Sequence, residues 1–259
     1  MKAIKLATLL LVLCLMSKVL LAQEYKVQVE NSKAGKLILN DFGGDFPVEG
    51  YSGNEIIITS SSARFTKTPE RAKGLKAVYP MGTDNTGIGL KLEKNGNIVT
   101  VQCLLPITQR EVYKIKVPNN FALDIKSECG LSGNISIRNI NNEVEINNCK
   151  SIDLKAVSGP LVLSTINGDI NVVFNDLNKD KPTSIATISG SIDITLPAKT
   201  PADVEMATIR GNVYTDFDLT DPKERMRRIG GNNIKNSLNG GGANLKISNV
   251  SGDIYLRKG

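Results

Sequence analysis

Short runs of alternating apolar and polar residues recur along the second half of the chain, and each run follows a glycine. In one clear copy, Gly168 precedes Ile170 and Val172, whose side chains share a face because neighbouring strand residues point to opposite sides. Similar units follow five other glycines, namely Gly133, Gly159, Gly190, Gly211 and Gly252. Each unit predicts a turn that leads into a short strand with one buried face.

The spacing of these units predicts how the strands are arranged. Gly168 follows Gly159 by 9 residues, and Gly190 follows Gly168 by 22. A unit near 9 residues that doubles to about 20 indicates coils of two strands each, stacked so that segments about twenty residues apart lie directly over one another. One column of the core is then expected to contain Ile170, Ile192 and Ile254.

The predicted fold class is therefore all-β, of the parallel β-helix or β-solenoid type. A β-sandwich is the alternative, because it too is built from short strands with a turn about every 8–12 residues. The recurrence of one turn-plus-strand unit favours the solenoid. No stretch alternates helices with strands, which excludes an α/β fold.

Residues 23–126 form a less regular half, in which β-branched and alternating residues between turn signals predict strands. These strands are expected at Tyr25–Val29, Lys36–Leu39, Glu55–Thr59, Gly89–Leu92, Ile98–Cys103, Val112–Val117 and Phe121–Ile125. The segment Ser60–Gly87 has no strand periodicity. Within it, Thr68-Pro69-Glu70 has the pattern of a helix start, and Gly74 is expected to end that helix. We therefore expect a short helix at most.

Residues 1–22 are typical of a signal peptide. Lys2 and Lys5 precede the apolar run Leu9–Met16, and Ala22 offers a small residue at the cleavage point. The run is too short to span a bilayer, which requires about 20 apolar residues. We therefore predict an exported chain whose mature part has no transmembrane segment.

The mature chain is expected to be one continuous domain with two portions. Residues 23–126 are the irregular β portion, and residues 127–259 are the repeat-strand solenoid. An excursion is predicted at 219–242, because its charged and glycine-rich stretches interrupt the strand pattern. One helical turn is expected after Asp221, and the chain returns to the solenoid at Asn244–Ile247.

The charge of the chain is mild. Its formal net charge is +6, from 32 basic and 26 acidic residues. Residues 1–22 contain three lysines, so their removal leaves 29 basic residues against 26 acidic and a net charge of +3. Because a nucleic-acid surface needs a concentrated basic stripe, we expect no nucleic-acid partner.

Three cysteines, Cys103, Cys129 and Cys149, lie beyond residue 22. An odd number is not the disulfide framework of a small secreted domain. Cys129 and Cys149 are 20 residues apart, close to one coil, so a disulfide between stacked neighbours is one interpretation. Two small thiols buried in the stacked core are the other, which is favoured because free cysteine is among the most buried residue types.

The sequence offers little for catalysis. It contains no histidine, which removes Ser-His-Asp and Cys-His catalysis and histidine-ligated metals. A polysaccharide lyase or hydrolase is the enzymatic alternative, with Asp169, Asp193 and Asp253 on related coils as acid, base or Ca²⁺ ligands. Single aspartates at turns more commonly serve local hydrogen bonding. We therefore expect no catalytic residue, no metal and no cofactor.

Two tyrosines are candidates for binding a ligand. Tyr214 and Tyr255 occupy matching outward positions after Gly211 and Gly252. They are expected to form an aromatic ladder for a glycan, or a simple cross-strand pair that stabilises the sheet by about 0.2–1 kcal/mol.

Basic loop residues form the second set of candidates. Arg225, Arg227 and Arg228 follow one another closely and are expected to meet anionic envelope polymers or lipid headgroups. This binding is a hypothesis, and a solvated loop is the commoner explanation of such a run. Another basic cluster has the same two interpretations and contains Arg64, Lys67, Arg71, Lys73 and Lys76.

The order of these motifs resembles a bacterial family of putative adhesins. Its marks here are Tyr113–Pro118, the repeated Ser/Asn-Gly-x-Ile-x-Ile strands, and Asn239–Gly242 leading to Val250–Leu256. Gly74-Leu75-Lys76 with Asp84–Leu90 resembles one branch of that family. The resemblance covers nearly all of the mature chain and implies an exported, Bacteroides-type repeat-strand protein with a right-handed β-helix-like structure. It implies no activity and no functional residues.

These observations predict an exported, non-enzymatic β-solenoid that acts as an adhesin or as a structural or binding module of the cell envelope. Its expected location is the periplasm, the cell surface or the extracellular space. Its expected partner is an envelope or host-surface ligand, with a glycan as the candidate class. The alternatives are a carbohydrate-active β-helix enzyme and an envelope-stress accessory protein that binds a partner through Ser60–Gly87.

Overall fold

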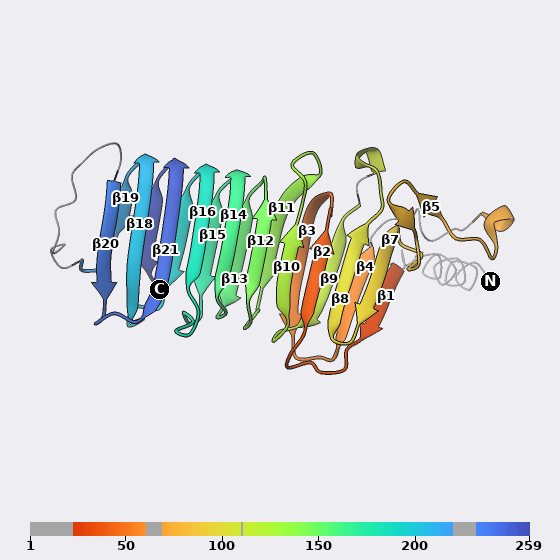
Figure 1. Ribbon diagram of the computed structural model, residues 1–259, viewed down its shortest axis with the longest axis horizontal. Helices are drawn as coiled ribbons and strands as arrows, with labels where there is room; N and C mark the ends of the chain where they lie inside the picture. The colour runs from red at the N-terminus through yellow and green to blue at the C-terminus, as the bar shows by residue number, and fades with distance from the viewer. Residues whose placement is uncertain (1–22, 61–68, 110, 220–231) are drawn as a thin grey trace, which may run out of the picture.

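The computed structural model describes residues 23–60, 69–109, 111–219 and 232–259. Two ten-stranded β-sheets enclose one hydrophobic core and form a long, flattened body (Figure 1). In stacking order, sheet A contains β1 (Gln23–Gln28), β4 (Glu55–Ser60), β9 (Tyr113–Pro118), β3 (Gly44–Tyr51), β11 (Ser132–Arg138), β13 (Ile152–Val157), β15 (Ile170–Phe174), β17 (Ile192–Leu196), β22 (Ile254–Lys258) and β19 (Val213–Thr215). Sheet B contains β20 (Asn232–Leu238), β18 (Ala202–Arg210), β21 (Ala243–Ser251), β16 (Thr183–Ser189), β14 (Leu161–Asn167), β12 (Val144–Asn148), β10 (Ala122–Lys126), β2 (Lys36–Asn40), β8 (Ile98–Cys103) and β7 (Leu90–Asn95).

The remaining elements of the described residues are small. A hairpin of β5 (Val78–Tyr79) and β6 (Gly82–Thr83) projects from the end of the body near β7, and the short helix η2 (Glu70–Ala72) precedes it (Figure 1). The short helix η3 (Ile107–Gln109) lies between β8 and β9. The helix start predicted at Pro69 thus leads to a single turn, as expected. Among the described residues, no helix has the length and apolar character needed to cross a membrane.

Each coil of the solenoid is a strand of sheet B, a corner, and a strand of sheet A. Coil strands pair in parallel with the same strand of the next coil, so Ile170 lies beside Ile192, and Ile192 beside Ile254. All three side chains are buried, because alternate residues of each strand point into the shared core. The predicted parallel stacking of two-strand coils is therefore confirmed.

The coils do not stack in the order in which they occur along the chain. The last coil, β21–β22, lies between β16–β17 and β18–β19. At the other end of the body, β2–β3 lies between β8–β9 and β10–β11. The expectation that segments about twenty residues apart always lie over one another is wrong here. Gly190 and Gly211 are separated in the stack by the corner of Gly252, which contacts both.

Antiparallel strands cover most of the open ends of the two sheets. In sheet B, β20 pairs with the outer edge of β18 and β7 pairs with the outer edge of β8. In sheet A, β4 pairs antiparallel with β9 and carries β1 on its other side. Residues 232–238 therefore belong to a sheet, although the sequence predicted an excursion there. Sheet A ends at β19, which has three residues.

The first half of the chain joins the same two sheets. All of its predicted strands are present, at β1, β2, β4, β7, β8, β9 and β10. The sequence missed β3, in which Pro47 interrupts the strand pattern. Proline cannot donate to a ladder, and β9 pairs with β3 only from Val48 onward, so no donor is required of Pro47 on that side.

The corners that lead from sheet B to sheet A are tied together by a ladder of side-chain hydrogen bonds. In each rung a Thr or Asn donates to a corner carbonyl of the neighbouring rung. The pairs are Asn148 to Gly133 at 3.0 Å, Thr165 to Lys150 at 2.8 Å, Thr187 to Gly168 at 3.2 Å, Asn249 to Gly190 at 2.7 Å, Thr208 to Gly252 at 3.0 Å and Asn232 to Gly211 at 2.9 Å. These donors satisfy carbonyl groups that the turning backbone leaves without a strand partner.

Close stacking of these corners explains the recurring glycines. A Cβ atom on Gly211 would lie 2.0 Å from the carbonyl oxygen of Gly252. A Cβ atom on Gly252 would lie 2.1 Å from the carbonyl oxygen of Gly190. Only glycine leaves room for the backbone of the next corner at these positions.

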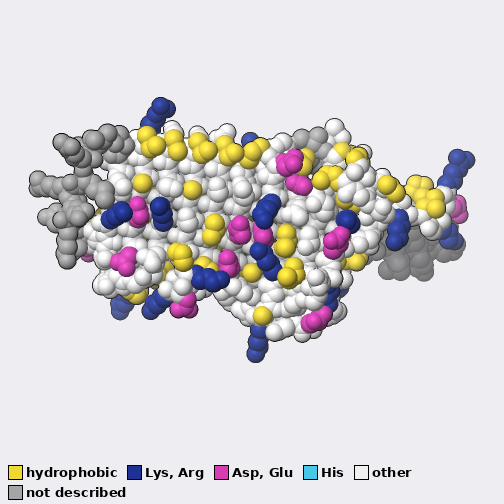
Figure 2. All heavy atoms as spheres, viewed as in Figure 1, with side chains coloured by type: hydrophobic (Ala, Val, Ile, Leu, Met, Phe, Trp, Pro, Cys, Tyr) yellow, Lys and Arg dark blue, Asp and Glu magenta, His cyan; other side chains and the backbone are white. Residues whose placement is uncertain are grey.

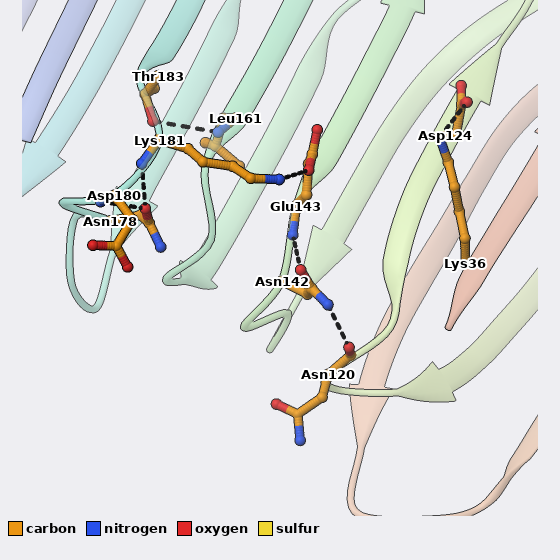
Figure 3. A network of polar contacts seen from close by, with 10 residues as sticks. All are labelled: Lys36, Asn120, Asp124, Asn142, Glu143, Leu161, Asn178, Asp180, Lys181 and Thr183. Carbon is orange, nitrogen blue, oxygen red and sulfur yellow. Dashed lines mark hydrogen bonds and ion pairs between the residues drawn. The ribbon is translucent and has the colours of Figure 1, made fainter. Parts of the chain in front are cut away.

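The opposite corners, which lead from sheet A to sheet B, use longer polar side chains (Figure 3). The amide of Asn142 donates to the carbonyl oxygen of Asn120 at 2.7 Å, while its Oδ1 accepts the backbone N–H of Glu143. Lys181 reaches the Oε2 of Glu143 at 2.7 Å, which links the turn before β16 to the start of β12. Both kinds of corner therefore hold the stack together along its length.

Candidate functional site

Tyr214 and Tyr255 lie side by side at the open end of sheet A. They are register partners on β19 and β22, and their rings stack with centroids 5.3 Å apart and planes 13° apart. Tyr214 is 49% exposed, because it stands on the last strand of the sheet. The two candidate tyrosines are thus brought together as an outward-facing pair.

A charged pair continues this stack on the side of Tyr255. The guanidinium of Arg257 lies 5.2 Å from the centre of the Tyr255 ring. It also donates to both carboxylate oxygens of Asp193 on β17, with Nε–Oδ1 at 2.8 Å and Nη2–Oδ2 at 2.9 Å. The hydrogen bond and the charge of Asp193 raise the pKa of Arg257. Cation–π contact and a bidentate ion pair together hold Tyr255 in place.

The hydroxyl of Tyr255 is fixed as well. It donates to Oδ2 of Asp253 at 3.3 Å, and desolvation together with this carboxylate raises the pKa of Tyr255. The phenol therefore remains protonated at neutral pH and offers its oxygen as an acceptor. The site as a whole is a shallow surface of two tyrosines, an arginine and two aspartates. Among the described residues, no group of three His, Cys, Asp or Glu side chains is arranged to hold a metal ion.

The three aspartates considered for catalysis have structural partners. Asp169 accepts the backbone N–H and the hydroxyl of Ser191 at the next corner. Asp253 accepts the backbone N–H of Asn212 at 2.8 Å in the same way. Asp193 is outward on β17 and pairs with Arg257. Asp169 and Asp253 therefore serve local hydrogen bonding at corners, as single aspartates at turns commonly do.

Most of the basic candidates lie outside the described residues. This is so for Arg225, Arg227 and Arg228, for the helical turn predicted after Asp221, for the signal peptide, and for Arg64 and Lys67. Arg71, Lys73 and Lys76 are described and exposed, around η2 at the projecting end of the molecule.

Cys129 and Cys149 form a disulfide, with Cα atoms 5.1 Å apart. The favoured interpretation as two buried thiols is wrong, because Cys129 lies in an exposed turn where it meets the end of β12. Cys103 is free and buried, and burial raises the pKa of its thiol. A protonated, inaccessible thiol is a poor nucleophile.

Sequence reasoning missed an apolar ridge on the outer face of sheet B. Four aliphatic side chains, one from each of four consecutive strands, form it: Ile166 (47% exposed), Ile188 (52%), Val250 (42%) and Ile209 (57%). They are in line because Thr165, Thr187, Asn249 and Thr208, each one residue earlier, are register partners. Figure 2 shows the ridge as a continuous row of hydrophobic atoms along one edge of the molecule.

A signal for this ridge is present in the sequence. Each member stands two residues before a corner glycine, whereas the repeated strand pattern that predicts the fold lies after those glycines. The glycines concerned are Gly168, Gly190, Gly252 and Gly211.

Among solved structures, the chain is similar to a putative cell adhesion protein from Clostridium sporogenes, with 14% identity and a TM-score of 0.47 over 92% of this chain and 100% of that one. It is also similar to a putative adhesin from Bacteroides fragilis, with 12% identity and a TM-score of 0.39 over 90% and 96% of the two chains. A putative adhesin from Parabacteroides merdae gives 13% identity and a TM-score of 0.28 over 90% and 95%.

No curated protein matches the chain. A family model described as Toastrack DUF4097 matches residues 19–257, which is nearly the whole sequence. The resemblance to the putative adhesins drawn from the motifs is thereby confirmed. The chain belongs to the Toastrack (DUF4097) family.

Proposed function

We propose that this chain is an exported, non-enzymatic β-solenoid that acts in the cell envelope or at the cell surface as an adhesion or binding module. Its proposed ligand is a glycan. The observation that carries the proposal is the stacked pair of Tyr214 and Tyr255, presented on the last two strands of sheet A.

The chemistry of the pair suits a sugar. A pyranose ring has an apolar face of C–H groups and a rim of hydroxyls, so it is recognised by an aromatic ring with hydrogen-bonding groups close by. Tyr214 offers the ring, and Tyr255 supports it from behind. Asp193 and Arg257 lie on the far side of Tyr255 and hold its ring in place for this role.

The placement of the aspartates supports binding over hydrolysis. A glycosidase needs two carboxyl groups that are free to act as acid and as base or nucleophile. Here Asp169 and Asp253 accept backbone N–H groups at corners, and Asp193 is held by Arg257. Each carboxylate already stabilises the fold.

Two observations support export. Residues 1–22 have the composition of a signal peptide. The Cys129–Cys149 disulfide fits an oxidising compartment, since such bonds are rare in the cytosol.

We retain right-handed coiling as a prediction, because crossovers between parallel strands of one sheet are almost always right-handed.

Glycan binding by purified protein tests the proposal. Isothermal titration against chito-oligosaccharides and oligogalacturonate measures affinity for a neutral and an acidic probe. We expect Tyr214→Ala and Tyr255→Ala to weaken binding at least tenfold, while Val173→Ala, an exposed change on β15 of the same sheet, leaves it unchanged. Equal binding by Tyr214→Ala and the unmodified chain would remove the tyrosine pair from the proposal.

The same titration tests the role proposed for Arg225, Arg227 and Arg228. If they attract acidic glycans, raising the salt concentration from ~50 to ~500 mM weakens binding of oligogalacturonate and spares the neutral probe. Binding of both probes that is insensitive to salt would assign these arginines to a solvated loop.

A second candidate function is partner binding through Ser60–Gly87. The described part of this segment exposes three large apolar side chains on the projecting hairpin and beside it, Leu75 (72%), Val78 (75%) and Met81 (52%). A photo-crosslinking amino acid at Val78 tests this function in cells. One defined adduct, lost in Leu75→Ser, would support it, and no adduct would count against it.

A further inference from the structure

The apolar ridge of Ile166, Ile188, Val250 and Ile209 borders a second column on sheet B. Two residues earlier in each strand stands a small side chain, and register places these side chains in line as well. The column contains Ser164, Ala186, Ser248 and Ala207. Every rung therefore presents one protruding aliphatic group beside one shallow position.

This pattern is complementary to itself. A two-fold rotation about an axis that runs along the stack, between the two columns, places each rung over the same rung of a second copy. Ile188 of one copy then faces Ala186 of the other, and Ile209 faces Ala207. Sheets that pack in this way lie about 10 Å apart, with the ridge of each copy filling the shallow column of the other.

From this geometry we propose that the ridge is the dimer interface of the chain, and that its occupant is a second copy. Strands repeat every ~4.8 Å along a sheet. A second solenoid has the same repeat, so all four rungs engage in register. The interface is isologous, because each copy contributes the same residues.

Charges and corners agree with this rotation. It places Glu205 of each copy, which pairs with Lys235 of β20 at 3.4 Å, over the Gly211 corner of the other copy, beside the exposed Arg210. It places Lys246 over the corner of Gly252, where the lack of a side chain leaves room. No two like charges face each other among the four rungs.

The size of the interface sets its strength. A third outward column, of Val162, Ser184, Lys246 and Glu205, lies beside the small side chains. Four rungs by these three columns cover roughly 400 Å² per copy at strand spacings, about half of what a standard interface buries on each partner. We therefore expect a weak dimer that forms at high protein concentration, as at a crowded cell surface.

Sedimentation velocity of the purified chain from ~1 to ~200 μM tests the proposal. The unmodified chain is expected to shift from monomer toward dimer, and Ile188→Lys to remain monomeric throughout. Val173→Lys, a matched exposed change on sheet A, is expected to dimerise normally, and so is Tyr214→Ala, which separates this test from glycan binding. A monomer at every concentration, or a dimer of Ile188→Lys, would overturn the interface.

Crosslinking tests the same geometry without relying on a disruptive variant. Ala186→Cys and Ile188→Cys are expected to crosslink when mixed, because these positions face each other, and neither is expected to do so alone. Cys103 is buried and Cys129 is bonded to Cys149, so the native cysteines do not interfere. No crosslink in the mixture would contradict the proposed rotation.

Membrane lipid is the competing occupant of an exposed apolar ridge. Co-sedimentation with vesicles of phosphatidylglycerol and phosphatidylethanolamine measures it. Vesicle binding that Ile188→Lys abolishes, by a chain that stays monomeric at ~200 μM, would overturn the proposal and assign the ridge to lipid.

Discussion

The side-chain amide of Asn249 donates a 2.7 Å hydrogen bond to the carbonyl oxygen of Gly190, 59 residues earlier in the chain. This bond joins the last coil to a coil that it does not follow in sequence. Asn249 is 4% exposed, so water does not replace a lost partner.

Asn249→Ala is therefore expected to destabilise the protein by about 1–3 kcal/mol, because the partly buried carbonyl of Gly190 loses its donor and the backbone N–H of Ser251 loses its acceptor. Asn244→Ala, an exposed change on the same strand, is expected to alter stability by less than about 0.5 kcal/mol. Urea unfolding followed by circular dichroism measures both. Similar midpoints for the two variants would show that the corner ladder contributes little.

Gly211→Ala tests the packing of the corners. The added Cβ would overlap the carbonyl oxygen of Gly252, at 2.0 Å, although Gly211 itself has an ordinary backbone conformation. We expect a loss of about 1–3 kcal/mol from overpacking alone. At Gly130 an added Cβ meets nothing within 4 Å, so Gly130→Ala is the matched control. Equal thermal midpoints for the two alanine variants would contradict close corner stacking.

The Cys129–Cys149 bond is expected to stabilise the fold. It closes a loop with a sequence separation of 20 residues, for which the chain-entropy estimate is about 3 kcal/mol. Reductant is therefore expected to lower the thermal midpoint of the unmodified chain. The Cys129→Ser, Cys149→Ser double variant should start at the lower value and show no response to reductant. A response in that variant would point to another cause.

Asp124 gives the fold a defined response to acid. Its burial raises the pKa of the carboxyl, but the hydrogen bond and charge of Lys36 at 2.8 Å, with Lys126 beside it, outweigh burial and bring the pKa below its usual value (Figure 3). Because the folded state binds the proton more weakly than the unfolded state, this contribution is present above about pH 4. It disappears as the pH falls through the lowered pKa.

Lys36→Met is expected to reduce stability at pH 7 by about 1 kcal/mol. It should also flatten the loss of stability between about pH 4 and pH 2, since Asp124 then differs less from its unfolded state. Unfolding midpoints measured across this range give both effects. If the stability of Lys36→Met falls between about pH 4 and pH 2 as steeply as that of the unmodified chain, other carboxylates cause the pH dependence. Lys114→Met, an exposed change on β9, serves as the control.

The sequence predicted the strands and their pairing well because both follow from local chemistry. A corner needs glycine, and a two-faced strand needs alternation, so Gly168 with Ile170 and Val172 is sufficient to place β15. The stacking of Ile170 on Ile192 followed from the same period.

The order of the coils could not be predicted, because the rungs offer similar aliphatic faces to one another. Ile192 packs against Ile254 as well as it would against Val213, and only contacts such as Asn249 with Gly190 distinguish the two arrangements. The strand β3 was missed because Pro47 hides the alternation. The apolar ridge was missed because Ile188 and its equivalents stand on the outward face of their strands, and an aliphatic residue in an alternating strand is ordinarily expected to point inward.

The position of β21–β22 between two coils that precede it in sequence has a consequence for folding during synthesis. Translation proceeds from the amino end, so β18–β19 is made before the segment that will separate it from β16–β17. Until residues 243–258 are made, the position between β16–β17 and β18–β19 is unfilled, and β18 can pair only with β20. Folding is therefore expected to finish in one late step, when β21–β22 inserts between its two neighbouring coils. A chain that stalls before this step would be exposed to quality-control proteases.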